Sequence, residues 1–167
     1  AAPYISAILE AGITTGCGGG LFCPDDLVTR EQMAAFLVRA IEGEEPAADA
    51  CGGVAPFLDV DPNGWSCGYI ARLADLGITT GSGNGTFNPV AFVSREQMAA
   101  FIVRAIDGEP ASDYCGAVSP FDDVAPASWA CGYIKRLAEL GVTTGCGSGN
   151  FCPAMEETRA QMAALLA

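Results

Sequence analysis

The sequence predicts a mainly α-helical protein made of three tandem helix-loop-helix modules, with little or no sheet. First, the chain repeats itself at a spacing of 64 to 65 residues. Second, both tracts of each copy carry apolar residues at helical spacing, and capping residues and glycines mark their ends. Because one helix pair cannot bury both of its apolar faces alone, we expect the modules to share one core in a pseudo-threefold arrangement.

The first helix of each module is predicted from the tract that begins at Tyr4, Tyr69 and Tyr133. In the middle copy the apolar face contains Ile70 and Leu73. A glycine follows each periodic tract, where a left-handed backbone conformation ends a helix at little steric cost. These glycines are Gly12, Gly77 and Gly141.

The second helix of each module opens with a capping box, in which a hydroxyl and a glutamine satisfy each other's backbone N–H groups. The three pairs are Thr29 with Gln32, Ser94 with Gln97, and Thr158 with Gln161. Between the two helices of each copy lies a loop that contains glycine, an aromatic residue and proline.

The repeat sets the expected domain bounds, which are residues 1–45, 46–109 and 110–167, forming together one compact domain. The first module lacks the lead-in segment of the other two, and the last is clipped at its C-terminal end. In the second and third modules we expect Asp59 and Asp123 of these irregular lead-ins to cap the following helix.

Composition excludes several classes of function. Half of the 167 residues are hydrophobic, which indicates a compact globule. A net charge of -12 argues against nucleic acid or an anionic lipid surface as the main partner. No apolar run approaches the roughly 20 residues that span a bilayer, so membrane insertion is not expected.

The eight cysteines form two kinds of pair, each with its own repeated spacing. The loop pairs are Cys17 with Cys23 and Cys146 with Cys152, and the lead-in pairs are Cys51 with Cys67 and Cys115 with Cys131. The middle loop carries Ser82 and Asn88 instead, and the joint absence of both cysteines favours disulfide bonds. Zinc is the alternative, but the chain has no histidine and no Cys-x-x-Cys. Disulfides predict an oxidising, extracellular location.

The sequence does not predict an enzyme. Without histidine there is no Ser-His-Asp or Cys-His arrangement, and no carboxylate pair recurs across the copies, although glycoside hydrolysis by such a pair stays open. No cofactor or metal is predicted. Asp59 to Gly64 resembles the start of a calcium loop, but Ile70 stands where a carboxylate is needed, so turn chemistry is the other interpretation. Asn84-Gly85-Thr86 matches the N-glycosylation triplet.

An arginine follows each capping hydroxyl, and it is the strongest candidate for ligand binding. The three residues are Arg30, Arg95 and Arg159. An arginine beside free N–H groups at a helix start makes a receptor for a carboxylate. The other interpretation is an exposed residue that pairs with a nearby carboxylate, although a cation at a helix N-terminus opposes the helix dipole. Trp65 and Trp129 are candidates for stacking on sugars, with core aromatics as the alternative.

The order of these motifs resembles the S-layer homology family over nearly the whole chain. An aspartate-containing lead-in is followed by tryptophan, then by "LGITTG", by phenylalanine and proline, and by "TREQMA". The family's Thr-Arg-Ala-Glu signature maps to residues 29–32, 94–97 and 158–161, where the arginine is kept and glutamine replaces the final glutamate.

The resemblance implies a non-catalytic module that anchors a surface protein or layer at the cell surface. In that family, grooves between modules hold cell-wall polysaccharide, often through pyruvate-modified sugars. The expected partner here is such a polysaccharide, or peptidoglycan, and the expected ligand-binding residues are the arginines, the capping-box residues and the two tryptophans. The alternative function is a self-assembling subunit of an extracellular filament or layer, because the incomplete terminal modules could pack against a neighbouring copy in a homopolymer.

Overall fold

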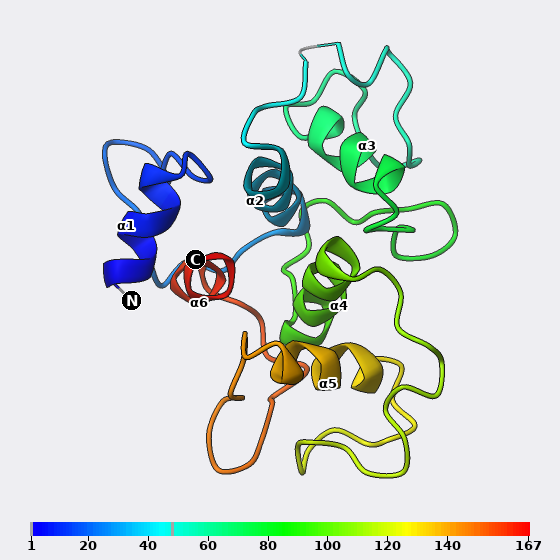
Figure 1. Ribbon diagram of the computed structural model, residues 1–167. Helices are drawn as coiled ribbons and strands as arrows, with labels where there is room; N and C mark the ends of the chain where they lie inside the picture. The colour runs from blue at the N-terminus through cyan, green and yellow to red at the C-terminus, as the bar shows by residue number, and fades with distance from the viewer. Residues whose placement is uncertain (1, 48) are drawn as a thin grey trace. The chain divides into compact units, whose positions relative to one another are not determined.

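The computed structural model describes residues 2–47 and 49–167, and this part of the chain contains six α-helices and no strand (Figure 1). The helices are α1 (Ala2–Glu10), α2 (Arg30–Glu42), α3 (Cys67–Asp75), α4 (Arg95–Ile106), α5 (Cys131–Glu139) and α6 (Arg159–Leu166). The only pairings of extended backbone among the described residues are isolated bridges. The prediction of a mainly α fold with little or no sheet is confirmed.

The chain forms two compact units. Unit 1 comprises the described residues of Ala1–Val93 together with Thr158–Ala167, and unit 2 comprises Ser94–Glu157. In unit 1, α1 packs against α6 and α2 packs against α3, while in unit 2 α4 packs against α5. Each helix therefore packs against a helix of another predicted module. The module bounds and the pseudo-threefold relation stay predictions.

The second helices begin as predicted, each with a complete capping box. The hydroxyls of Thr29, Ser94 and Thr158 accept from the glutamine backbone N–H, and the glutamine side chains accept from the cap N–H. One turn later the equivalent methionines Met33, Met98 and Met162 are fully buried. The caps thus fix the register in which the apolar face meets its partner.

The first helices are followed by the expected glycines. Gly12, Gly77 and Gly141 all have φ between 70° and 72°, a left-handed conformation in which an L side chain would be strained. The turn that follows buries the next aliphatic residue, for example Ile78 at 2% exposure. Each glycine therefore ends a helix and returns the chain to the core.

The same backbone hydrogen bond recurs between modules at equivalent positions of the repeat. The N–H of the residue after each cap donates to a carbonyl of another module, at 2.8 to 2.9 Å. These bonds run from Arg30 to Ala91 and from Arg159 to Asp26 in unit 1, and from Arg95 to Met155 in unit 2. In unit 1 the contact from Arg159 joins the last helix to the first module.

All four predicted disulfides are present, and the described residues hold no free cysteine. In the middle loop, Asn88 Nδ2 donates to Ser82 Oγ at 2.9 Å, so a hydrogen bond takes the place of the bond between sulfurs. Asn88, Cys23 and Cys152 share a left-handed backbone with φ of 55° to 59°. The middle loop thus keeps its shape without the disulfide.

The expected capping role of the lead-in aspartates is wrong. Asp59 accepts from the backbone N–H groups of Phe87 and Asn88, both at 2.7 Å, and Asp123 does the same with Phe151 and Cys152. Both oxygens of each carboxylate are used in these contacts, one for each N–H group. Each aspartate therefore holds the loop between the two helices of its own module, at a residue 28 positions further along the chain.

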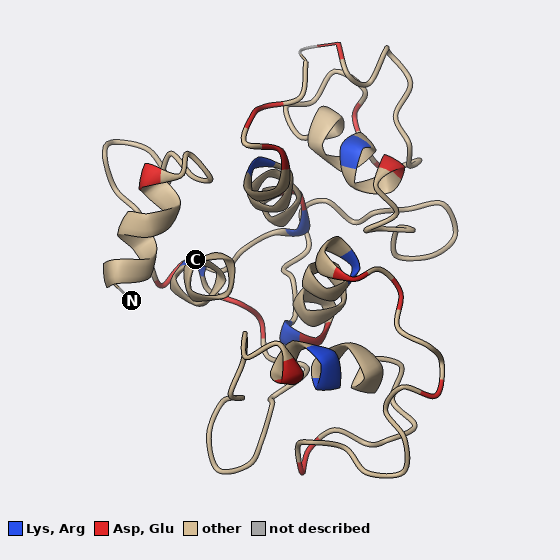
Figure 2. Cartoon of the chain, in the orientation of Figure 1, with Lys and Arg blue, Asp and Glu red and all other residues tan. Residues whose placement is uncertain are grey.

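The charges are distributed unevenly (Figure 2). All eight basic residues lie on helices, whereas many of the acidic residues lie in the connecting segments. Among the described helices, none is long and apolar enough to cross a membrane.

Candidate functional site

The three candidate arginines occupy equivalent, buried positions. Arg30, Arg95 and Arg159 are 4%, 8% and 5% exposed. The Nε of each donates to a phenylalanine carbonyl at 2.7 to 2.8 Å, and each guanidinium lies over that phenylalanine's ring at 4.7 to 4.9 Å. The phenylalanines are Phe87, Phe151 and Phe22. The interpretation of these arginines as exposed residues of the first turn is therefore wrong.

The expectation of free N–H groups beside the arginines is also wrong. The first two N–H groups of each second helix donate to carbonyls of another module, as Arg159 N does to Asp26 and Ala160 N does to Pro24, both at 2.9 Å. The next N–H donates to the capping hydroxyl. Packing between modules has used the donors that an isolated helix would offer to a ligand.

Arg159 lines a cavity together with other candidate residues. This cavity of about 480 Å³ belongs to unit 1. Its lining comes from all three predicted modules and consists of Thr14, Thr15, Gly16, Cys17, Asp26, Leu27, Gln32, Phe36, Arg39, Trp65 and Arg159. Three predicted site residues, Gln32, Trp65 and Arg159, therefore meet in one place. We call it the Arg159 cavity.

The Arg159 guanidinium retains donors for a ligand. Its Nε is bound by the Phe22 carbonyl, and one Nη donates to the Thr14 hydroxyl at 3.4 Å, the limit of a hydrogen bond. No carboxylate in the described part of the chain forms an ion pair with it. Burial lowers the pKa of Arg159, and the nearby Asp26 carboxylate partly offsets this effect. An arginine nevertheless stays protonated at neutral pH, so it offers a partly desolvated positive charge.

Both candidate tryptophans are exposed. Trp65 is 59% and Trp129 is 56% exposed, so the interpretation as core aromatics is wrong. Each indole packs edge-on against the tyrosine four residues later, with ring centroids 6.2 and 6.1 Å apart. That contact holds the ring in place and leaves much of its surface in water.

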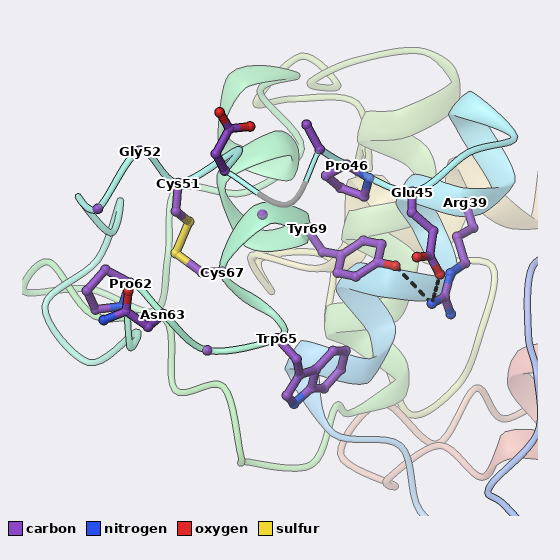
Figure 3. A pocket seen from close by; sticks show the side chains of 15 residues that line it. Arg39, Glu45, Pro46, Cys51, Gly52, Pro62, Asn63, Trp65, Cys67 and Tyr69 are labelled. Carbon is purple, nitrogen blue, oxygen red and sulfur yellow. Dashed lines mark hydrogen bonds and ion pairs between the residues drawn. A yellow bond between two sulfur atoms is a disulfide. The ribbon is translucent and has the colours of Figure 1, made fainter.

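A second cavity, of about 830 Å³, lies on unit 1 beside the first (Figure 3). Trp65 and Arg39 line both cavities. In Figure 3 the Glu45 carboxylate and the Tyr69 hydroxyl are directed at Arg39, whose Nη2 donates to them at 2.7 and 2.8 Å. Burial raises the pKa of Tyr69. We call this the Tyr69 cavity.

The remaining predicted site residues have structural partners. The capping boxes use the hydroxyls of Thr29, Ser94 and Thr158 and the glutamines Gln97 and Gln161. A ligand role for these residues, and for Arg30, Arg95 and Trp129, stays a prediction.

Sequence reasoning missed the threonines of the site. Thr14 and Thr15 line the Arg159 cavity, and Thr14 Oγ1 accepts from Gly16 N at 3.1 Å as well as from Arg159. The tract Thr-Thr-Gly recurs in every copy, at residues 14–16, 79–81 and 143–145. That recurrence, outside any helix, was a signal that could have revealed them.

The calcium-loop segment forms an ordinary turn. Asp61 Oδ1 accepts from Asn63 N at 2.9 Å, two residues away. Within residues 2–47 and 49–167, no group of three or more acidic, cysteine or histidine side chains could hold a metal ion.

A thrice-repeated helix pair whose arginines lie at inter-module contacts defines a tandem-repeat protein, and residues of different copies line its cavities in unit 1. Comparison with known families identifies it: residues 1–34, 56–99 and 120–163 each match the S-layer homology domain. The chain belongs to the S-layer homology domain family. The predicted resemblance is confirmed.

Relatives include a cell surface protein of Thermoanaerobacter kivui, 33% identical over 86% of this chain and 17% of the relative. An S-layer protein of Bacillus thuringiensis subsp. finitimus is 26% identical over 98% of this chain and 19% of its own length. A cellulosome-anchoring protein of Acetivibrio thermocellus is 29% identical over 83% of this chain and 30% of its own length. The chain thus spans less than a third of each of these relatives. The family and these relatives confirm the predicted cell-surface location.

Proposed function

We propose that this chain is a non-catalytic module that anchors a surface protein by binding an acidic cell-wall polysaccharide in the Arg159 cavity. The observation that carries the proposal is the meeting of a guanidinium, an exposed indole and an amide in that cavity. Its volume of about 480 Å³ lies within the range typical of small-ligand sites, roughly 300 to 1,000 Å³.

Arg159 supplies the recognition of an acidic group. A guanidinium has five N–H donors in a rigid fork, and the described contacts of Arg159 use two of them. A carboxylate of a pyruvate-modified sugar can accept two parallel hydrogen bonds from such a fork. On a chain of net charge -12, this local cation selects an anion that the rest of the surface repels.

Trp65 supplies the contact with the sugar ring. Its indole is 59% exposed and is held edge-on by Tyr69, so a sugar can stack on it without an ordering cost to the protein. Because Trp65 also lines the Tyr69 cavity, a polysaccharide that enters the Arg159 cavity continues over the indole into the second hollow. A polymer therefore fits the site better than a single sugar.

The test is cosedimentation of Arg159→Lys with purified bacterial cell walls. Lysine keeps the charge but loses the fork, so we expect apparent affinity to fall by about tenfold or more. Arg72→Lys is the matched control, because Arg72 lies outside the Arg159 cavity and pairs with Glu42 on the surface. Equal sedimentation of both variants with the unaltered protein would contradict the proposal. Walls stripped of their acidic polysaccharide should retain none of the three proteins. Retention of the unaltered protein on stripped walls would identify peptidoglycan as the partner instead.

The alternative function is a self-assembling subunit of an extracellular filament or layer. In unit 1, α1 of the first predicted module packs against α6 of the third, so this contact forms within one chain. Self-assembly stays an untested prediction.

A further inference from the structure

Glu157 departs from the repeat at a position where an apolar residue is expected. It lies two residues before Arg159, and the equivalent residues of the first two modules are Val28 and Val93, both fully buried. Glu157 is equally buried, at 1% exposure. A carboxylate thus replaces a core valine in one module of three.

This carboxylate is only half satisfied. Glu157 Oε1 accepts from Arg95 Nη1 at 3.0 Å, while Oε2 is buried without a hydrogen-bond partner among the described residues. A buried ion pair with an unpaired oxygen gains little stability over an apolar side chain of similar size. Folding alone therefore gives no reason for a glutamate here, whereas its position against Arg95 does.

Arg95 and Arg159 differ in their ion pairing. Both bind a phenylalanine carbonyl through Nε and lie over that phenylalanine's ring. Arg159 has the weak contact with the Thr14 hydroxyl, whereas Arg95 already holds a carboxylate from its own chain.

We propose that Glu157 is an internal anion that occupies Arg95, so that the repeated arginines are not equivalent and an acidic ligand is excluded from Arg95. The inference rests on the proposed function, because it uses the same chemistry of a guanidinium and a carboxylate. An incoming carboxylate at Arg95 would have to displace Glu157 or lie beside its negative charge, and both are unfavourable in a buried site. Glu157 is therefore a specificity-determining residue that limits which copies of the repeat bind.

The experiment follows the arginine Nε–H signals of the full chain by NMR during titration with the methyl glycoside of a pyruvate-ketal hexose. In the unaltered protein we expect the Arg159 signal to shift and the Arg95 signal to stay. In Glu157→Gln, which keeps the side chain's shape, and in Glu157→Val, which restores the residue of the other modules, the Arg95 signal should shift as well. The apparent Kd at Arg95 should fall by about tenfold or more.

Glu156→Gln is the matched control. Glu156 is the exposed neighbour of Glu157, so this variant removes the same charge from the same segment without touching Arg95. The Arg95 signal of this variant should not shift during the titration. Thermal unfolding of each variant checks that unit 2 is folded, and the use of two Glu157 variants covers the case in which one of them fails to fold.

The outcomes separate the two proposals. An Arg95 signal that shifts in the unaltered protein, or that stays silent in both folded Glu157 variants, overturns the internal-anion inference. An Arg159 signal that stays silent while Arg95 gains a response in the variants supports that inference and contradicts the proposed Arg159 site.

Discussion

At the scale of single residues, the buried charge of Glu157 makes stability depend on pH. Burial raises the pKa of Glu157, and the Arg95 guanidinium offsets only part of the effect. The folded state therefore holds the proton more tightly than the unfolded state. The stability this provides is present at low pH and is lost as the pH rises from the ordinary value of 4.5 through the raised pKa.

The first prediction concerns that window. Relative to Glu157→Gln, the unaltered protein should lose unfolding free energy as the pH rises from the ordinary value of 4.5 through the raised pKa of Glu157. Glu156→Gln, on the exposed neighbour, should follow the unaltered protein throughout. Thermal unfolding at several pH values measures the differences. A gap between the unaltered protein and Glu157→Gln that does not change with pH contradicts the assignment.

The second prediction concerns the aspartates that hold the loops. Asp123→Asn removes one of the two acceptor oxygens that bind Phe151 N and Cys152 N, so it should cost about 1 kcal/mol of unfolding free energy at this exposed site. Asp122→Asn changes the adjacent aspartate, which makes no such pair of bonds. Chemical denaturation compares the two variants, and equal stability would show that the backbone clamp contributes nothing.

At the scale of elements, the three loops share one backbone conformation that is held either by a disulfide or by a side-chain hydrogen bond. Each loop places a left-handed residue after its aromatic residue, and two loops hold that shape with a disulfide. The middle loop uses the hydrogen bond from Asn88 to Ser82.

The third prediction exchanges the disulfide and the hydrogen bond between loops. The double variant Ser82→Cys with Asn88→Cys should form a further disulfide and gain about 2 kcal/mol by restricting the unfolded chain. The reciprocal variant, Cys17→Ser with Cys23→Asn, should lose a similar amount and still fold. Thiol counting by mass spectrometry and thermal unfolding test both. Free thiols in the folded protein that carries the two new cysteines would disprove equivalence of the loops.

At the scale of the whole molecule, the proposed binding site depends on the packing of α1 against α6. The Arg159 cavity needs Arg159 from α6 and the threonines that follow α1, and these two helices pack together in unit 1. A change that weakens the packing of α1 against α6 should therefore also weaken ligand binding.

The fourth prediction follows from this dependence. Ile8 is 1% exposed on α1, so Ile8→Ala should cost about 2 to 4 kcal/mol in unit 1 and weaken sedimentation with cell walls. Leu9 is the adjacent residue and is 43% exposed, so Leu9→Ala should change neither property appreciably. A destabilised Ile8→Ala protein that still binds walls normally would separate the helix contact from the site.

What sequence alone determined lies in local chemistry. The capping boxes, the terminating glycines and the four cysteine pairs all depend on residues close in the chain, and the structure confirms each of them. The family also followed, because its motifs are local and recur three times.

Tertiary structure alone decided what each side chain faces. Sequence patterns suggested either arginines beside free helix N–H groups or exposed arginines of the first turn. Contacts between modules instead bury the arginines and use those N–H groups. The targets of Asp59 and Asp123, the Thr14 contact and the pairing of Arg95 with Glu157 join residues 28 to 145 positions apart. Periodicity along a chain shows which face of a helix is apolar, but it cannot show which distant segment covers that face, and only that packing decides which charges stay available to a ligand.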